Sequence, residues 1–163
     1  MIRRVLAIAV LATATLGVLA APGHAASKPD PCKLLKTSEI SQQFGGATVS
    51  AGVKGLATPV SQSCKFTVAA AGDTPAGDVT VRVMTTGGKA AYNGLKKLNA
   101  GYVPVAGLAN SLWNDKTEAL SVLKGSTLVT VQPIFTSADT LPIHTVDTQA
   151  QAIALIKLAA KRV

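Results

Sequence analysis

Two cysteines, Cys32 and Cys64, constrain the fold of this chain most, because a bond between them would tie two segments together across 32 sequence positions. Cys32 has four conceivable roles: a lipid anchor, a nucleophile, a metal ligand or one half of a disulfide. Residues 28–31 before it are charged or proline, whereas a lipidation site has small or apolar residues there. The only histidine beyond residue 25 is His144. Two cysteines and one histidine are too few ligands for a closed zinc site, and the sequence places no evident base beside either thiol. In an exported chain such an even pair predicts a Cys32–Cys64 disulfide.

Residues 1–25 have the composition of a secretory signal peptide. Arg3 and Arg4 form a positive start, residues 5–21 are uncharged and mostly apolar, and residues 23–25 place small side chains at the −3 and −1 positions of a cut before Ala26. An uncleaved anchor is the alternative, because the apolar run approaches the length that spans a bilayer. We expect cleavage and one domain over 26–163 that is secreted, extracellular or associated with the cell wall, without a stable membrane anchor.

The charge of the chain gives weak information about partners. Loss of Arg3 and Arg4 with the leader lowers the formal net charge from +8 to +6, and the remaining basic residues are scattered. No basic stripe with interleaved aromatic rings is present, so we expect no nucleic-acid partner. We expect a monomer that binds an unknown small molecule, a peptide or an extracellular protein.

Hydrophobic periodicity predicts helices at both ends of the domain and strands between them. Asp30 and Pro31 favour a helix start, and Gly45-Gly46 ends that helix. In 78–85, Val79, Val81 and Val83 face one way and the polar residues Thr80 and Arg82 the other, which is typical of a half-buried strand. The other expected elements are strands at 48–53, 64–70, 117–123 and 127–135 and helices at 89–99 and from the cap Asp147 to Arg162, with a tight hairpin at 124–126.

A short string occurs twice in equivalent places. VKGLA at 53–57 and VAGLA at 105–109 each follow a helix and lead into a pair of strands, which suggests a helix-strand-strand pseudo-repeat. The resulting order predicts an α+β fold in which helices pack on one face of an antiparallel sheet.

The sequence offers little that is typical of catalysis. There is no Gly-x-Ser-x-Gly elbow and no Asp/Glu/His cluster, and residues 85–89, TTGGK, fit a glycine turn before a helix better than a phosphate loop. We therefore expect a protein that is not an enzyme, with no catalytic residues, no metal site and no cofactor.

Several short motifs together resemble a known family. The chain carries DPCKLLKTSEI at 30–40, Cys64-Lys65-Phe66 and PVAGLANSLW at 104–113 before a glycine hairpin and a C-terminal helix. It resembles an actinobacterial family of exported lipoproteins and secreted proteins of unknown function and, more distantly, the extracellular sensor domains of mycobacterial receptor kinases. The chain departs from that pattern in lacking a lipidation cysteine and in having Lys36-Thr37 where Thr-Pro is usual.

The resemblance implies a function class rather than a reaction. It implies a Cys32–Cys64 disulfide, an α+β domain with a groove between sheet and helices, and a binding or sensing role in the cell envelope. Gly107, Leu108 and Trp113 are the candidate ligand-binding residues, because a turn there carries the one tryptophan. The alternative for Trp113 is that it is a core or rim ring, which is the more frequent place for a single tryptophan. The alternative is a proteinaceous inhibitor of an extracellular hydrolase, a protease or a β-lactamase, that presents a rigid convex loop.

Overall fold

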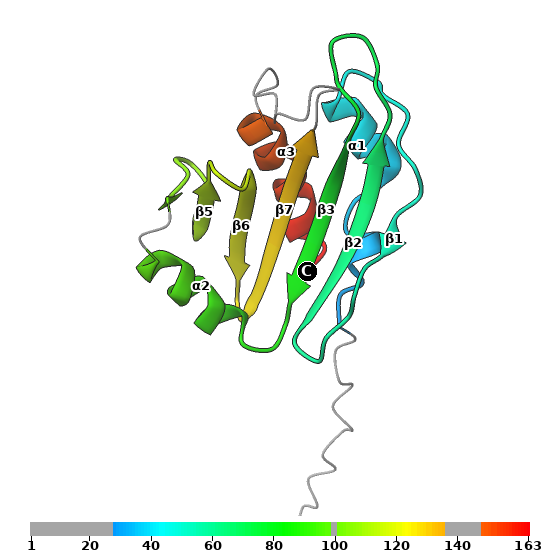
Figure 1. Cartoon of the computed structure of the whole chain (residues 1–163). Helices are drawn as coiled ribbons and strands as arrows, with labels where there is room; N and C mark the ends of the chain where they lie inside the picture. Colours follow the sequence, from blue (N-terminus) through cyan, green and yellow to red (C-terminus); the bar gives the residue numbers. More distant parts are fainter. Residues whose placement is uncertain (1–27, 99–100, 136–147) are drawn as a thin grey trace, which may run out of the picture.

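The computed structural model describes residues 28–98, 101–135 and 148–163, and these build a seven-stranded antiparallel sheet with its helices (Figure 1). The strands are β1 (Val53–Lys54), β2 (Ser61–Val68), β3 (Gly77–Met84), β4 (Tyr102–Val103), β5 (Ser111–Asn114), β6 (Ala119–Lys124) and β7 (Thr127–Phe135). The helical segments are η1 (Pro31–Lys33), α1 (Thr37–Gln43), α2 (Gly88–Lys97) and α3 (Thr148–Lys161). The predicted α+β class and antiparallel sheet are confirmed.

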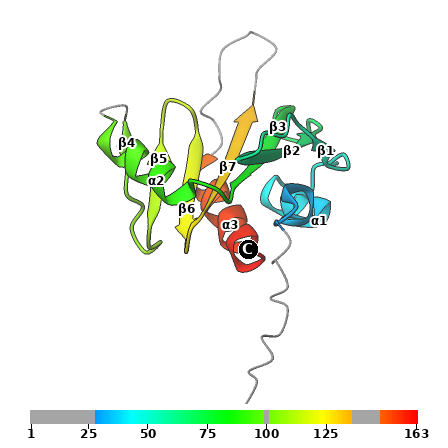
Figure 2. The same cartoon turned by 90° about the horizontal axis from the view of Figure 1, so that it is seen from below.

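The order of the strands explains where α2 lies. The sheet runs β1-β2-β3-β7-β6-β5-β4, so the chain leaves β3 near the middle and must reach the far edge before it returns to pair β7 with β3. α2 makes that crossing and contacts β7, β6 and β4. Because α1 and α3 pack on the other face of the sheet, the crossing runs over the face that they leave uncovered (Figure 2).

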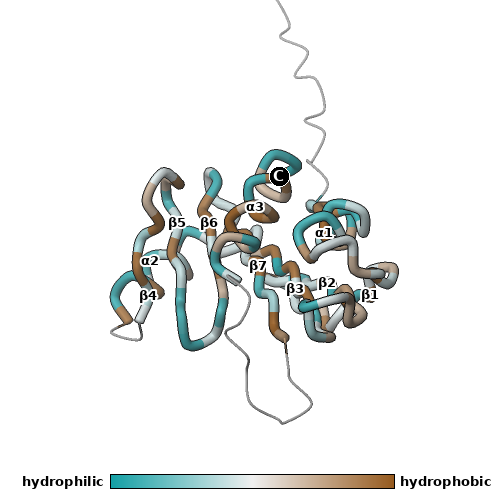
Figure 3. The backbone as a smooth tube through the Cα atoms, turned by 90° about the horizontal axis from the view of Figure 1, so that it is seen from above, coloured by the Kyte–Doolittle hydropathy of each residue, from teal (hydrophilic) through white to brown (hydrophobic). Residues whose placement is uncertain are grey.

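The sheet face that α1 and α3 cover contains the main hydrophobic core. The predicted alternation in β3 is confirmed, since Val79, Val81 and Val83 are buried there. At one end of the sheet the ring of Phe44 packs on that of Phe135, with centroids 4.7 Å apart. Hydrophobic segments lie on α3 and on the central strands (Figure 3). The main core therefore lies between this face of the sheet and the helices α1 and α3.

α2 corrects the expectation that all helices lie on one face. A second, smaller cluster joins Tyr92 of α2 to Leu112 and Leu128 on the face opposite the main core. α2 starts very close to the β6–β7 hairpin: a Cβ on Gly88 would lie 2.5 Å from the carbonyl oxygen of Ser126. Glycine is therefore required there for packing, which agrees with the predicted glycine turn at 85–89.

The predicted disulfide is present. The Cys32 and Cys64 sulfurs are 2.11 Å apart and the Cα atoms 5.1 Å apart, so the bond joins η1 to β2. Asp30 caps η1 as predicted, because its carboxylate accepts a hydrogen bond from the backbone N–H of Cys32 at 3.0 Å. The single helix that the sequence predicted here is two separate helical segments, η1 and α1. At the start of α1, the Glu39 carboxylate accepts a hydrogen bond from the Lys36 N–H at 2.8 Å.

The β6–β7 hairpin agrees with the sequence. Lys124 pairs with Thr127, which leaves Gly125 and Ser126 as the loop, and Gly125 has a positive φ of 60°. β4 and β5 were not predicted. All four residues of β5 are buried, so this strand lacks the alternation by which a half-buried strand is found.

The pseudo-repeat is visible in the order of elements. In each half, a helix is followed by a two-residue edge strand, the Gly-Leu-Ala string and two longer strands. The two halves lie on either side of β7, and β1 and β4 form the two edges of the sheet. Their environments differ, since Leu56 is exposed whereas Leu108 packs against the main core.

Three predictions fall on residues that the structure does not describe: the leader at 1–25, the helix cap Asp147 and the loop that contains His144. Within the described ranges, no helix is both long and apolar enough to cross a membrane.

Candidate functional site

The predicted ligand-binding residues do not surround an exposed ring. Trp113 lies on β5 and is only 4% exposed, because its indole is part of the main core. Leu108 packs against the same core, and Gly107 sits in a turn with a positive φ of 73°. Ser111 holds this turn by donating a hydrogen bond from its hydroxyl to the Leu108 carbonyl at 2.6 Å. Trp113 is thus a core residue, and this segment does not offer its ring to a ligand.

A hollow lies on the opposite face, between α2 and the sheet. We call this cavity of about 300 Å³ the α2 groove. It is lined by Thr80, Arg82 and Met84 of β3, Ala91 and Leu95 of α2, Tyr102 of β4, Thr117 and Ala119 at the start of β6, and Leu128, Thr130 and Gln132 of β7. None of the three predicted ligand-binding residues lines it.

The strand pairing orders the floor of the α2 groove into rows. Met84 pairs with Leu128 next to α2, Arg82 pairs with Thr130, and Thr80 pairs with Gln132 farthest from α2. Successive rows are about 7 Å apart, since each strand residue advances about 3.4 Å. The floor therefore changes from apolar beneath α2 to polar at its other end, with the arginine between them.

Some polar groups on this floor are already hydrogen-bonded. The hydroxyls of Thr130 and Ser121 are 2.8 Å apart, and the Gln132 side-chain amide donates to the Thr117 carbonyl at 2.7 Å. These contacts hold the floor in place while leaving the Gln132 amide oxygen able to accept a further hydrogen bond.

Arg82 is the one cationic side chain among the described residues that line the α2 groove. It is exposed on a central strand, and within the described part of the chain it makes no hydrogen bond or ion pair. A guanidinium has five donors in a planar fork that matches a carboxylate. The site therefore has an unneutralised positive charge with an apolar surface beside it.

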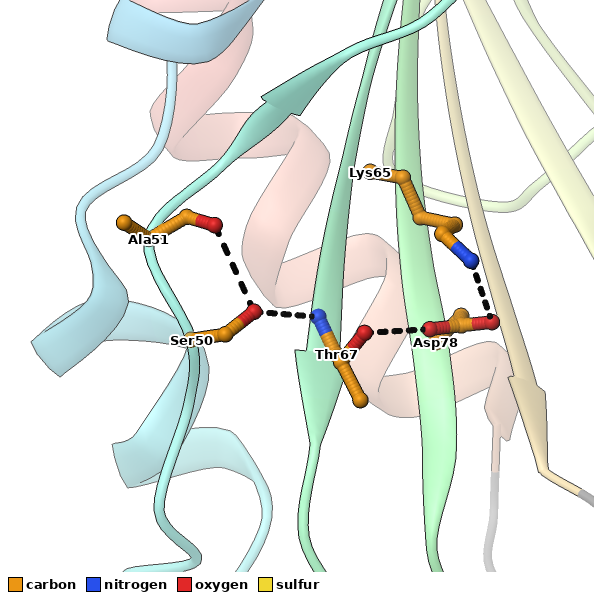
Figure 4. A network of polar contacts seen from close by, with 5 residues as sticks. All are labelled: Ser50, Ala51, Lys65, Thr67 and Asp78. Carbon is orange, nitrogen blue, oxygen red and sulfur yellow. Dashed lines mark hydrogen bonds and ion pairs between the residues drawn. The ribbon is translucent and has the colours of Figure 1, made fainter.

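The neighbouring charge on the same sheet face is neutralised. Lys65 pairs with Asp78 at 3.3 Å, and the other oxygen of Asp78 accepts a hydrogen bond from the Thr67 hydroxyl at 2.9 Å. Figure 4 shows both contacts. The Thr67 N–H donates in turn to the Ser50 hydroxyl at 3.0 Å. Lys65 thus has a built-in partner, which distinguishes it from Arg82.

The described lining of the α2 groove offers a ligand apolar contacts, hydroxyl groups and one guanidinium. Three or more Cys, His, Asp or Glu side chains do not come together as a metal site anywhere in the described ranges. The α2 groove combines a large apolar wall with a few polar groups that face inward, which is the usual composition of a small-ligand site.

The resemblance implied a groove between sheet and helices, but the sequence did not show which residues line it, because those residues are far apart in the chain. Arg82 was visible only as an outward-facing residue of a patterned strand, and nothing local placed Leu95 or Tyr102 near it. Comparisons with protein-family models, with curated proteins and with solved structures found no match for this chain.

Proposed function

We propose that this protein is a secreted, non-enzymatic domain that binds or senses a small or peptide-like ligand in the α2 groove. The observation that carries the proposal is the groove itself, a cavity of about 300 Å³ with an apolar wall and Arg82, which has no ion-pair partner among the described residues. That volume is at the lower end of small-ligand sites, about 300 to 1,000 Å³. The resemblance to exported lipoproteins and secreted proteins of unknown function and, more distantly, to extracellular sensor domains favours the same class.

Filling the α2 groove should abolish binding. Ala91 lines the groove, so Ala91→Phe places a ring inside it, whereas the adjacent Ala90 is exposed and does not line it. We expect octanoate, 1-octanol or N-acetyl-leucyl-leucine amide to shift backbone NMR signals around the groove, with a Kd below about 1 mM for at least one of them. Ala91→Phe should remove these shifts, and Ala90→Phe should keep them.

That experiment can also refute the proposal. If none of the three probes shifts signals of groove residues, or if Ala91→Phe binds them as the wild type does, the α2 groove is not the binding site. Thermal unfolding of both variants shows whether each phenylalanine leaves the fold intact.

One observation favours a second candidate, an inhibitor of an extracellular hydrolase. Leu56 is 94% exposed on the loop between β1 and β2, where an apolar side chain gains nothing from folding. The loop is tied down on both sides of Leu56. The Gly55 N–H donates to the Ser63 carbonyl at 3.0 Å, and the Thr58 N–H donates to the Ser61 carbonyl at 2.8 Å. A hydrogen-bonded loop with an exposed apolar side chain suits a protease whose primary pocket is apolar.

Inhibition assays against chymotrypsin and subtilisin test this candidate. If it is correct, the protein inhibits one of them, and Leu56→Asp weakens inhibition by about 100-fold or more, because the anchor of an interface carries most of its energy. Leu98→Asp is the matched control, since Leu98 is also an exposed leucine, at 56%, on a different segment. Absence of inhibition, or equal effects of the two substitutions, rejects this use of the loop.

A further inference from the structure

We infer that the ligand of the α2 groove is a small amphipathic carboxylate, with its carboxylate on Arg82 and its apolar tail beneath α2. This inference rests on the proposed binding function and adds the chemical class of the ligand. It follows from the charge of the groove, from the position of Arg82 along its floor and from the volume of the cavity.

The charge of the groove favours an anion with a single negative charge. Among the described residues that line it, Arg82 is the one cation, and none is Asp or Glu. Asp78, on the same strand and the same sheet face, is already held by Lys65 and Thr67. A phosphate monoester carries nearly two negative charges and is usually bound by several cations or by backbone N–H groups. A carboxylate matches one guanidinium in charge and in its two-oxygen geometry.

The position of Arg82 defines the orientation of the ligand. Met84 and Leu128 form the row next to it on the α2 side, and Ala91 and Leu95 lie over that end. A carboxylate on Arg82 therefore directs an attached apolar tail under α2 over a distance of about 7 Å or more. On the other side, Thr80 and Gln132 offer polar contacts to any further group near the carboxylate.

The cavity volume limits the size of the tail. A cavity of about 300 Å³ is at the lower end of small-ligand sites, which suits a chain of medium length rather than a folded partner. Eight-carbon compounds are therefore suitable probes, because octanoate, 1-octanol and octylammonium share one tail and differ in the charge of the head group.

The test is a binding titration of these three probes, followed by NMR, with wild-type protein and three variants. We expect octanoate to bind about 10-fold to 100-fold more tightly than 1-octanol, as for one charged hydrogen-bonded contact. Octylammonium should bind more weakly than 1-octanol because the cation faces Arg82. Arg82→Gln should reduce octanoate affinity to that of 1-octanol without changing 1-octanol itself. Arg82→Lys should retain part of the preference.

Lys65→Gln is the matched control. It removes one positive charge from the same sheet face, but Lys65 does not line the groove and already pairs with Asp78. We expect this variant to keep the octanoate preference of the wild type. Equal loss in Lys65→Gln and Arg82→Gln would show a general effect of net charge and would overturn the inference.

The outcomes separate this inference from the function on which it rests. If octanoate and 1-octanol bind the groove equally, the groove binds ligands but the carboxylate assignment is wrong. If no probe binds there, both proposals fail. If the protein forms a dimer that hides Arg82, the occupant is a second copy and the inference is wrong. N-acetyl-leucyl-leucine, tested as the free acid, supports the inference if it competes with octanoate, and tighter binding than octanoate assigns the tail to a peptide.

Discussion

Replacing Cys32 and Cys64 together with alanine is expected to lower the free energy of unfolding by about 3.5 to 4 kcal/mol. The closed loop spans 32 sequence positions, and its opening gives the unfolded chain more conformational freedom. Cys64 is also fully buried, so the lost sulfur leaves unfilled space in the main core. Urea unfolding measures the change, and the thermal midpoint should fall by about 10 °C or more.

Reduction of the wild-type protein provides the control for this prediction. It opens the same loop without removing a side chain, so it should account for most of the effect of the double substitution. A loss below about 1 kcal/mol in both experiments would mean that the disulfide barely restricts the unfolded chain. The prediction would then be wrong, and the anchoring of the N-terminal segment would depend on the buried side chains of Leu34 and Leu35.

The ion pair between Glu39 and Arg162 should make the protein sensitive to acid. Arg162 donates to both oxygens of the Glu39 carboxylate and to the Leu34 carbonyl at 2.7 Å, which ties the end of α3 to the N-terminal segment. The hydrogen bond from Arg162 lowers the pKa of Glu39 from 4.5 to about 2. The side chain is only 19% exposed, so solvent screens the pair less than a surface pair.

The sign of the pH dependence follows from this lowered pKa. The folded protein holds the carboxylate ionised more strongly than the unfolded chain does, so the pair stabilises the fold fully above pH 4.5, the ordinary pKa of the group. That contribution, about 2 to 3 kcal/mol, decreases as the pH falls from 4.5 toward 2. Glu39→Gln should lose most of it at pH 7 and should change less with pH across that window.

A matched substitution tests whether the effect is specific to this pair. Asp78→Asn breaks the Lys65 pair, whose side chains are 55% and 37% exposed, and should cost less than about 1 kcal/mol. Urea unfolding at several pH values between 2 and 7 compares each variant with the wild type, which cancels the contribution of Asp30, another group with a lowered pKa. Equal losses for Glu39→Gln and Asp78→Asn at pH 7 would contradict the prediction.

The parts of the fold that the sequence predicted are those that depend on neighbouring residues. Alternation identified β3, because Val79, Val81 and Val83 all face the core. Gly125 identified the β6–β7 hairpin, since the turn needs a positive φ. β5 was missed because the main core covers one side of it and the cluster that includes Leu112 covers the other, which removes the alternation.

The candidate site shows what local patterns leave undecided. The alternation along β3 placed Arg82 on the sheet face opposite the valines, but it did not show whether another element covers that face. That depends on the path of α2, which follows from the pairing of β3 with β7, about 50 positions apart in the chain. Trp113 lies in the core because the pairing of β5 with β6 places it opposite Leu120, another residue of the main core, although a lone tryptophan near a turn had indicated a ligand contact.

The sequence by itself therefore determined the α+β class, the disulfide and the outward position of Arg82. The first two follow from local periodicity and from a chain with two cysteines, and the third from alternation along one strand. Only the tertiary structure decided that α2 crosses the open face and forms a groove beside Arg82. The physical reason is that strand order sets which face a crossing helix can cover, and strand order depends on contacts between residues far apart in the chain.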